Sequence, residues 1–264
     1  MKRFEAVVFD WAGTMVDFGS FAPMGAFVEA FGEFGIEITT AQAREPMGMA
    51  KRDHIKTILE MPDISEKFKS VFGNHPGEQD IDRIYAVFVP MNERVAGRYA
   101  DLVPGSLEMI SYLRSRNIKI GSTTGYTRSI MEYVLPVAAA QGYAPDNLVC
   151  SDDVKNGRPA PDAMKRCFVE LGIKNPARVI KVDDTEPGIG EGKAAGCICV
   201  GVTLSGNFAA KTPDELDQMQ DDELNSIRLR AASKLKAAGA DYIIDTVCDL
   251  PALIENLEQD CQTD

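Results

Sequence analysis

Histidine is scarce in this chain of 264 residues, which contains only His54 and His75. Zinc and copper sites usually draw on several imidazole or thiolate ligands, so a metal site in this chain would be built mostly from oxygen atoms. Oxygen ligands favour magnesium over zinc. The composition therefore points to magnesium if the protein binds a metal ion.

Cysteine is present, but the paired spacing of a zinc site or a redox motif is absent. All six cysteines lie in the second half of the chain, and none belongs to a Cys-x-x-Cys pair. Two of them are two residues apart in a predicted strand and share a face, yet zinc would require two further ligands with suitable spacing. We expect buried, reduced thiols at Cys150, Cys167, Cys197, Cys199, Cys248 and Cys261.

Long apolar runs are missing too, and basic residues are outnumbered. No segment approaches the roughly 20 apolar residues of a membrane span. Residues 1–5 lead directly into a strand pattern rather than a signal peptide. The 28 basic and 40 acidic residues give a formal net charge of −12, which disfavours a nucleic acid or an anionic membrane as partner. We expect a cytoplasmic protein that binds neither.

An apolar strand pattern close to the N-terminus carries the first chemically informative residue. Ala6–Phe9 is a run of strand length, so Asp10 would lie at its carboxyl end, and Gly13 with Thr14 would turn the chain. In open α/β sheets ligands bind at this edge. A carboxylate there can cap the next helix, or it can serve as a nucleophile or metal ligand.

The periodicity of the chain divides it into a helical part and an alternating part. Residues 18–100 show helical spacing throughout, and residues 46–48 are expected to open a helix. Beyond residue 103 helices alternate with strands, which predicts an α/β fold with a doubly wound parallel sheet and an inserted α-helical cap domain. The predicted core domain spans residues 1–17 and 101–264, and the cap spans 18–100. The later strands are expected at 118–121, 148–151, 179–182, 197–202 and 242–244, and the polar helical stretch 203–239 has no assigned role.

Polar clusters occur in four places that a parallel sheet would bring to one edge. They are Asp10, residues 122–126, residues 155–158 and residues 183–185. Carboxylates, a hydroxyl with loop amides and a cation are the groups needed to bind magnesium and a phosphoryl group. Each cluster alone could merely cap a helix, satisfy a turn or carry a solvated charge. Their joint occurrence, each near a strand end, favours a phosphoryl-transfer site.

Two nucleotide-binding patterns fail in residues 188–194. The dinucleotide fingerprint requires a third glycine where Lys193 stands, and a phosphate-binding loop requires Ser or Thr where Ala194 stands. Neither cofactor is supported.

These motifs resemble the haloacid dehalogenase-like phosphotransferases over nearly the whole chain, and within them the phosphonatase family. The phosphonatase motifs are specific in combination. The resemblance rests on residues 9–14 (FDWAGT), 44–48 (REPMG), 121–128 (GSTTGYTR) and 157–159 (GRP), together with Lys51 and His54.

The resemblance implies hydrolysis of the carbon–phosphorus bond of phosphonoacetaldehyde, giving acetaldehyde and phosphate, in a homodimer joined through cap helices. Many phosphatases of the superfamily place an acid where this chain has Ala12. By resemblance, Lys51 instead forms an imine with the aldehyde, and Asp10 forms an aspartyl phosphate. The implied catalytic residues are Asp10, Lys51, His54, Thr124 and Arg158; substrate contacts are Met47, Gly125 and Tyr126; Mg²⁺ ligands are Asp10, Ala12 through its carbonyl, and Asp184.

Some positions leave alternatives open. His54 lies three residues after Lys51 on a predicted helix and could shuttle protons, or it could be a packed structural histidine. Ser20 stands where a related enzyme has cysteine. Gly188 replaces a further aspartate of the acidic loop, so Asp183 is an uncertain additional metal ligand.

The neutral form of Lys51 is required for attack on an aldehyde. We therefore expect burial and nearby positive charge, with Arg52 and His54 as candidates, to hold its pKa below the ~10.4 of a free lysine.

Two other functions fit parts of the pattern. A capped phosphomonoesterase or sugar-phosphate mutase would keep Asp10 and magnesium and use Lys51 as a substrate-binding cation, but Ala12 argues against it. A non-catalytic phosphate-binding protein is disfavoured because Asp10, Thr124, Arg158 and Asp184 are all retained.

Overall fold

The described residues, 4–260 of the computed structural model, contain one five-stranded parallel sheet with the order β2-β1-β3-β4-β5. Phe9 at the end of β1 pairs with Ser122 on one side and with Val182 on the other. The predicted doubly wound α/β fold is therefore confirmed. The strands are β1 (Ala6–Phe9), β2 (Lys119–Ser122), β3 (Val179–Asp183), β4 (Ile198–Val202) and β5 (Tyr242–Ile244).

Helices cover both faces of this sheet because alternate strand side chains form two apolar cores. Val7 and Phe9 of β1 face one core, which α6, α7 and α12 complete. Ala6 and Val8 face the other core, which α8, α9 and α11 complete. The helices are α6 (Ser106–Ser115), α7 (Arg128–Ala140), α8 (Asp162–Leu171), α9 (Glu186–Ala194), α10 (Pro213–Asp217), α11 (Asp221–Ala237) and α12 (Leu250–Asp260).

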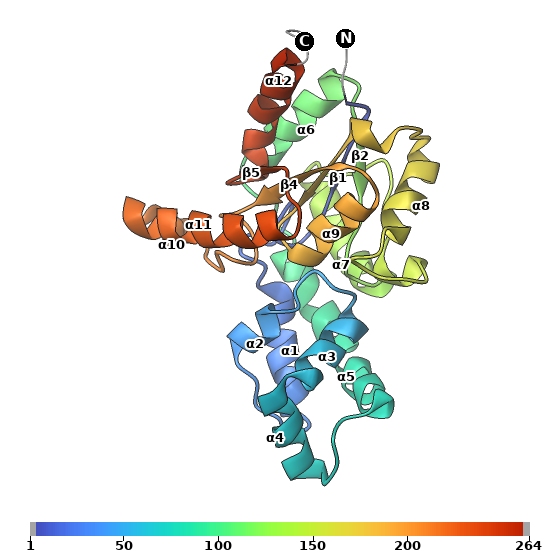
Figure 1. The fold of residues 1–264 in the computed structure, drawn as a ribbon, viewed down its shortest axis with the longest axis vertical. Coiled ribbons are helices and arrows are strands. Elements are labelled where there is room, and N and C mark those ends of the chain that lie inside the picture. Colours follow the sequence, from blue (N-terminus) through green and yellow to red (C-terminus); the bar gives the residue numbers. More distant parts are fainter. Residues whose placement is uncertain (1–3, 261–264) are drawn as a thin grey trace.

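The five longer elements between β1 and α6 are all helices, grouped at one end of the molecule below the sheet (Figure 1). They have an apolar core of their own, in which the Phe27 and Phe88 rings stack at 4.2 Å between centroids. We call this group the cap. Its helices are α1 (Ala22–Gly32), α2 (Thr40–Arg44), α3 (Lys51–Glu60), α4 (Pro62–Phe72) and α5 (Glu78–Ala96).

Two predicted elements are wrong. Residues 46–48 do not open a helix, because Gly48 has φ of +89° and the chain turns there before α3 begins at Lys51. Residues 148–151 do not form a strand, and Val149 makes only an isolated bridge to Thr123. Side chains occupy that edge of β2 instead, since Asp146 and Asn147 accept hydrogen bonds from its backbone N–H groups.

The polar stretch 203–239 contains α10 and α11, and it begins with a loop, residues 203–212, that lies against the end of the sheet. Among residues 4–260, no helix is long and apolar enough to span a membrane.

The expectation of buried thiols is correct for Cys150, Cys167, Cys197 and Cys199 and wrong for Cys248, which is exposed; Cys261 lies outside the described residues.

Candidate active site

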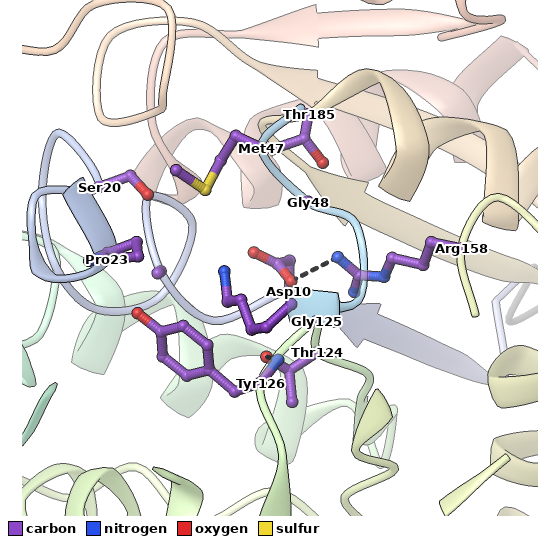
Figure 2. Close-up of a pocket in the computed structure, with 12 residues that line it drawn as sticks. Asp10, Ser20, Pro23, Met47, Gly48, Thr124, Gly125, Tyr126, Arg158 and Thr185 are labelled. Carbon is purple, nitrogen blue, oxygen red and sulfur yellow. Dashed lines mark hydrogen bonds and ion pairs between the residues drawn. The ribbon is translucent and has the colours of Figure 1, made fainter. Parts of the chain in front are cut away.

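A small cavity lies where the carboxyl ends of β1, β2 and β3 meet the cap. Its volume is about 20 Å³, close to the space that one water molecule needs. Eight of the ten predicted site residues line it, and His54 and Asp184 do not. The lining residues are Asp10, Ala12, Ser20, Pro23, Met47, Gly48, Lys51, Thr124, Gly125, Tyr126, Arg158 and Thr185 (Figure 2).

Asp10 follows β1 directly and is held by the neighbouring strand, since its backbone N–H donates to the Val182 carbonyl at 3.0 Å. Its side chain is 8% exposed and pairs with Arg158, whose Nη1 lies 2.8 Å from Oδ1. Burial and the negative charge of Asp183 raise the pKa of Asp10 to about 6, and Arg158 opposes this rise. Asp10 is therefore mainly ionised at neutral pH and points into the cavity (Figure 2).

A buried ionic network supports Arg158 from behind. Arg158 Nε lies 3.1 Å from Glu191, and Lys181 Nζ lies 3.4 Å from the same carboxylate. Both cations also donate to the Thr123 hydroxyl, which donates to Glu191. A buried charge that loses its partners is costly. The Arg158 guanidinium therefore stays in contact with Glu191 and Thr123, and these contacts fix it beside Asp10.

Three buried carboxylates, Asp10, Asp183 and Asp184, have oxygen atoms within 4.8 Å of one another and could hold a metal ion. Asp183 already has cations nearby, with Lys181 Nζ at 3.1 Å and Arg158 Nη1 at 3.4 Å. These charges hold the pKa of Asp183 below its usual range despite its burial.

Asp184 differs because no Lys or Arg nitrogen of residues 4–260 lies within 4 Å of it. It accepts hydrogen bonds from the Thr14 hydroxyl (3.1 Å) and the Asn207 backbone N–H (2.7 Å). Burial, followed by the charges of Asp10 and Asp183, raises the pKa of Asp184 well above its usual range. A divalent cation would supply the missing positive charge, so the residues present fit a metal with oxygen ligands.

The packing of the acidic loop explains why position 188 is a glycine. A Cβ at this position would lie 2.0 Å from the Asp183 carboxylate, so that carboxylate occupies the space of any side chain at 188. Asp184 is also enclosed by glycines, since a Cβ at Gly13 or Gly206 would lie 2.4 Å from it. The acidic loop therefore consists of Asp183 and Asp184 packed against backbone.

Lys51, the first residue of α3, is only 3% exposed, so it is not an ordinary surface lysine. Its Nζ lies 4.9 Å from the centre of the Tyr126 ring and 5.5 Å from that of Phe27. Within residues 4–260, no carboxylate oxygen lies within 4 Å of it. Burial lowers the pKa of Lys51 to about 8, the Asp10 charge opposes this, and Arg158 lowers it further.

Arg52 does not supply the positive charge expected near Lys51. Its guanidinium forms surface ion pairs with Glu78 and Asp82, each at 2.7 Å. Arg158 from the core has that role instead.

His54 lies behind the cavity in the cap core. It is fully buried, stacks on Phe27 at 3.9 Å, and places Nε2 2.8 Å from the Ala43 carbonyl. Because a carbonyl can only accept, we assign the proton to Nε2, which leaves Nδ1 as an acceptor with no partner among the described residues. Burial, and then the Lys51 charge, lower the pKa of His54 well below its usual range, so the ring is neutral.

The loop after β2 brings three predicted residues to the cavity wall. The Thr124 hydroxyl accepts from the Tyr126 backbone N–H at 3.1 Å, which leaves its own proton for a bound ligand. The Tyr126 hydroxyl is buried with no hydrogen-bond partner in the described chain. A Cβ at Gly125 would lie 2.7 Å from the Met49 carbonyl, so only glycine allows the cap loop to approach this closely. Met47 faces them from the cap (Figure 2).

Sequence reasoning missed several residues that hold this site. Lys181 has a recognisable signal, because a lysine inside the apolar strand 179–182 has to find a buried acidic partner. Glu191 and Asn207 have no such signal, and Arg44, although it belongs to the motif 44–48, had no predicted role. Their partners lie in remote segments that only the fold brings together.

Comparisons with known proteins give a consistent assignment. Residues 4–196 match the profile of the haloacid dehalogenase-like hydrolases. The phosphonoacetaldehyde hydrolase of Paraburkholderia phytofirmans is 48% identical, covering 98% of this chain and 97% of the relative. That of Vibrio cholerae is 46% identical, covering 97% and 95%.

Solved structures agree. A phosphonoacetaldehyde hydrolase-like protein from Oleispira antarctica has a TM-score of 0.95 at 41% identity, covering 97% of this chain and 93% of that one. A β-phosphoglucomutase from Clostridium difficile, at TM-score 0.67 and 20% identity over 94% of this chain and 93% of that one, shares the fold alone. This chain is therefore an enzyme of the haloacid dehalogenase-like hydrolase family and belongs, within it, with the phosphonoacetaldehyde hydrolases.

Proposed function

We propose that this enzyme hydrolyses phosphonoacetaldehyde to acetaldehyde and phosphate. The position of Lys51 carries the proposal. Its amine lines the same cavity as Asp10, no carboxylate of residues 4–260 lies within 4 Å of it, and Ala12 offers no acid for an ester leaving group. The names of the relatives, at 44–48% identity, support the same substrate.

An imine explains how the carbon–phosphorus bond can break. Cleavage leaves an electron pair on carbon, and a bare carbanion is a very poor leaving group. If the aldehyde is first bound to Lys51 as an iminium, the carbon leaves as an enamine instead. Only a neutral amine attacks an aldehyde, and burial lowers the pKa of Lys51 to about 8, so a useful fraction is neutral near physiological pH.

The steps balance with one net water. Lys51 Nζ bonds to the aldehyde carbon, and the carbinolamine loses water to give the iminium. Asp10 attacks phosphorus, the P–C bond breaks, and its electron pair forms the enamine double bond as the nitrogen becomes neutral. The enamine carbon takes a proton, and one water releases acetaldehyde and Lys51. A second water cleaves the aspartyl phosphate to phosphate and Asp10.

The remaining groups of the cavity bind and orient the phosphonate. Arg158, paired with Asp10 at 2.8 Å, offers positive charge beside the nucleophile, and the Thr124 hydroxyl can donate to a phosphonate oxygen. Mg²⁺ would be held by Asp10, the Ala12 carbonyl and Asp184, where its charge would stabilise the phosphonate oxygens in the transition state.

His54 is proposed to relay protons for Lys51. The free acceptor Nδ1 and the spacing of three residues on α3 support this role. Met47 and Tyr126 are proposed to contact the aldehyde end of the substrate, since both line the cavity.

A homodimer joined through cap helices remains a proposal, which sedimentation equilibrium of the intact chain tests.

Trapping the imine tests the proposal. Borohydride is added to enzyme with phosphonoacetaldehyde, and the adduct is located by peptide mass; we expect it on Lys51. Lys51→Arg keeps a cation but cannot form the imine, so it should lose both the adduct and the release of acetaldehyde. Absence of an adduct, together with an active arginine variant and phosphate release from monoesters, would instead identify a phosphatase.

A further inference from the structure

Arg44, at the end of α2 in the cap, reaches across to the core beside the acidic loop. Its Nη1 lies 2.9 Å from the Gly19 carbonyl, 3.1 Å from Asn207 Oδ1 and 3.4 Å from the Asn207 carbonyl. Asn207 Nδ2 donates back to the Arg44 carbonyl at 3.3 Å. One arginine therefore ties together the cap, the segment that links β1 to α1, and the loop that follows β4.

Asn207 also touches the predicted metal site. Its backbone N–H donates to Asp184 Oδ2 at 2.7 Å, and within residues 4–260 the Asp184 carboxylate accepts only one other hydrogen bond, from the Thr14 hydroxyl. Two residues earlier in the same loop, the Ser205 hydroxyl donates to the Gly13 carbonyl at 2.9 Å. The loop thus holds Asp184 from one side while Arg44 holds the loop from the other.

The cap segment after Arg44 leads directly into the cavity. Met47 and Gly48 line it, and a Cβ at Gly48 would lie 2.1 Å from Thr185 Oγ1 of the core. The cap is therefore closed on the core where Arg44 meets Asn207. Opening the cap for a substrate would separate this pair, and the loop that carries the Asn207 N–H would lose its contacts with Arg44.

We propose that Arg44 and Asn207 are positioning residues that couple cap closure to metal binding. We call the hydrogen bonds between Arg44 and Asn207 the clasp. The clasp fixes the loop that follows β4, in which the backbone N–H of Asn207 aligns Asp184. The protein with a closed cap therefore binds Mg²⁺ more tightly than the protein with an open cap. The inference rests on the proposed function only in taking Asp184 as a metal ligand. By linkage, Mg²⁺ must also favour the closed cap by the same factor.

A purely electrostatic role of Arg44 predicts the opposite change in Mg²⁺ affinity when its charge is removed, so an experiment can separate the two explanations. The Arg44 charge lies close enough to Asp184 for the two to interact. A positive charge there repels a divalent cation, so removing it would by itself tighten Mg²⁺ binding. The clasp predicts that removing it weakens binding.

The experiment measures the Mg²⁺ dissociation constant by calorimetry without substrate. Wild type is compared with Arg44→Gln, Arg44→Lys, Asn207→Ala and the double variant Arg44→Gln/Asn207→Ala. Asn207→Ala keeps the backbone N–H and changes no charge. Arg83→Gln is the matched control, because Arg83 is an exposed cap arginine that pairs with Asp80 at 3.4 Å and lies over the rings of Phe34 and Phe72, which also belong to the cap. Circular dichroism and thermal melts verify that each variant is folded.

We expect each of the three single variants at the clasp to weaken Mg²⁺ binding about tenfold, and the double variant to be no weaker than Arg44→Gln alone. Additive losses would mean that the two residues act independently. Unchanged or tighter binding in Arg44→Gln, or full affinity in Arg44→Lys, would overturn the proposal.

Hydrogen exchange gives a second readout that needs no turnover. Mg²⁺ should slow exchange of the amides of residues 45 and 47–50 in wild type and in Arg83→Gln, but not in Arg44→Gln. Equal protection in all three would contradict the coupling. Because neither measurement uses phosphonoacetaldehyde, failure of the proposed activity would show only in the turnover assay and would leave these results interpretable.

Discussion

Asp10 lies where the cation, the hydroxyl and the acidic loop meet, and this position determines what its loss should do. Asp10→Asn preserves shape but removes the nucleophile. We expect turnover of phosphonoacetaldehyde to fall by at least ~10³-fold, as when a central catalytic group is removed. Steady-state phosphate release measures it, and near-normal turnover would exclude Asp10 as the nucleophile.

Lys51 should give the reaction a characteristic pH dependence. Its pKa of about 8 in the folded protein means that the amine is mostly protonated at pH 7 and mostly neutral at pH 9. The rate of imine formation should therefore rise with pH and level off above about 8. The rate of borohydride-trapped adduct formation between pH 6 and 10 is the measurement, and a rate independent of pH would contradict a titrating Lys51.

The buried positive charge of Lys51 should also lower the free energy of unfolding. Between about pH 8 and the ~10.4 of an exposed lysine, the unfolded chain binds the Lys51 proton and the folded chain does not, so wild-type stability rises with pH. At pH 7 the charged amine costs about 3 kcal/mol, from ~1.4 kcal/mol per pKa unit.

Lys51→Met should therefore be inactive yet more stable than wild type at pH 7, and this advantage should shrink as the pH approaches 10. Urea unfolding at several pH values measures it. A less stable Lys51→Met at neutral pH would show that the amine is better accommodated in the fold than its burial implies.

Among the loops and strands, the approach of the cap loop to the core depends on Gly125. Gly125→Ala would place a Cβ 2.7 Å from the Met49 carbonyl and keep the cap from closing. We expect kcat/KM to fall about 10²-fold, since misplacement by ~1 Å can cost that much. Gly25→Ala is the matched control: it lies inside α1, nothing lies within 4 Å of its added Cβ, and it should raise stability by about 0.5–1 kcal/mol. Normal activity in Gly125→Ala would mean that cap closure at this point is dispensable.

The strands show what local pattern can and cannot predict. β1 and β3 were predictable because apolar residues of strand length, interrupted in β3 by Lys181, precede acidic turns, and the parallel order then brings Asp10 and residues 183–185 to one edge. Residues 148–151 carry a similar apolar pattern but lie beside β2 without pairing as a strand, because Asp146 and Asn147 already accept from its backbone. Such competition between side chains and backbone is decided by residues outside the apolar run.

The spacing of Lys51 and His54 also predicted only part of how the two side chains are arranged. Three residues on a helix predict a shared face, and both side chains are indeed buried on α3. Only the packing of Phe27 and the Ala43 carbonyl shows that the imidazole is held in the cap core while the amine lines the cavity. Such remote contacts also explain why the clasp between Arg44 and Asn207 could not be predicted.

Metal binding should stabilise the entire chain, because the three carboxylates lie close together only in the folded state. At a Mg²⁺ concentration 100 times the dissociation constant, the free energy of unfolding should rise by about 2.7 kcal/mol. Chelation should remove this gain and abolish turnover. Thermal melts with and without Mg²⁺ measure it, and Asp184→Ala should lose most of the response. An undiminished response in Asp184→Ala would rule out Asp184 as a ligand.

The order of strands in the sheet also has a consequence for how the protein is made. β1 is translated first of the five strands but lies inside the sheet, between β2 and β3, and both partners follow only after the cap has been completed. Since the cap has its own apolar core, we expect it to fold on the ribosome while β1 is still unpaired. The nascent chain therefore carries an exposed apolar segment, residues 6–9, at least until its first partner β2 has been made at residues 119–122, and this segment is where a ribosome-associated chaperone should bind.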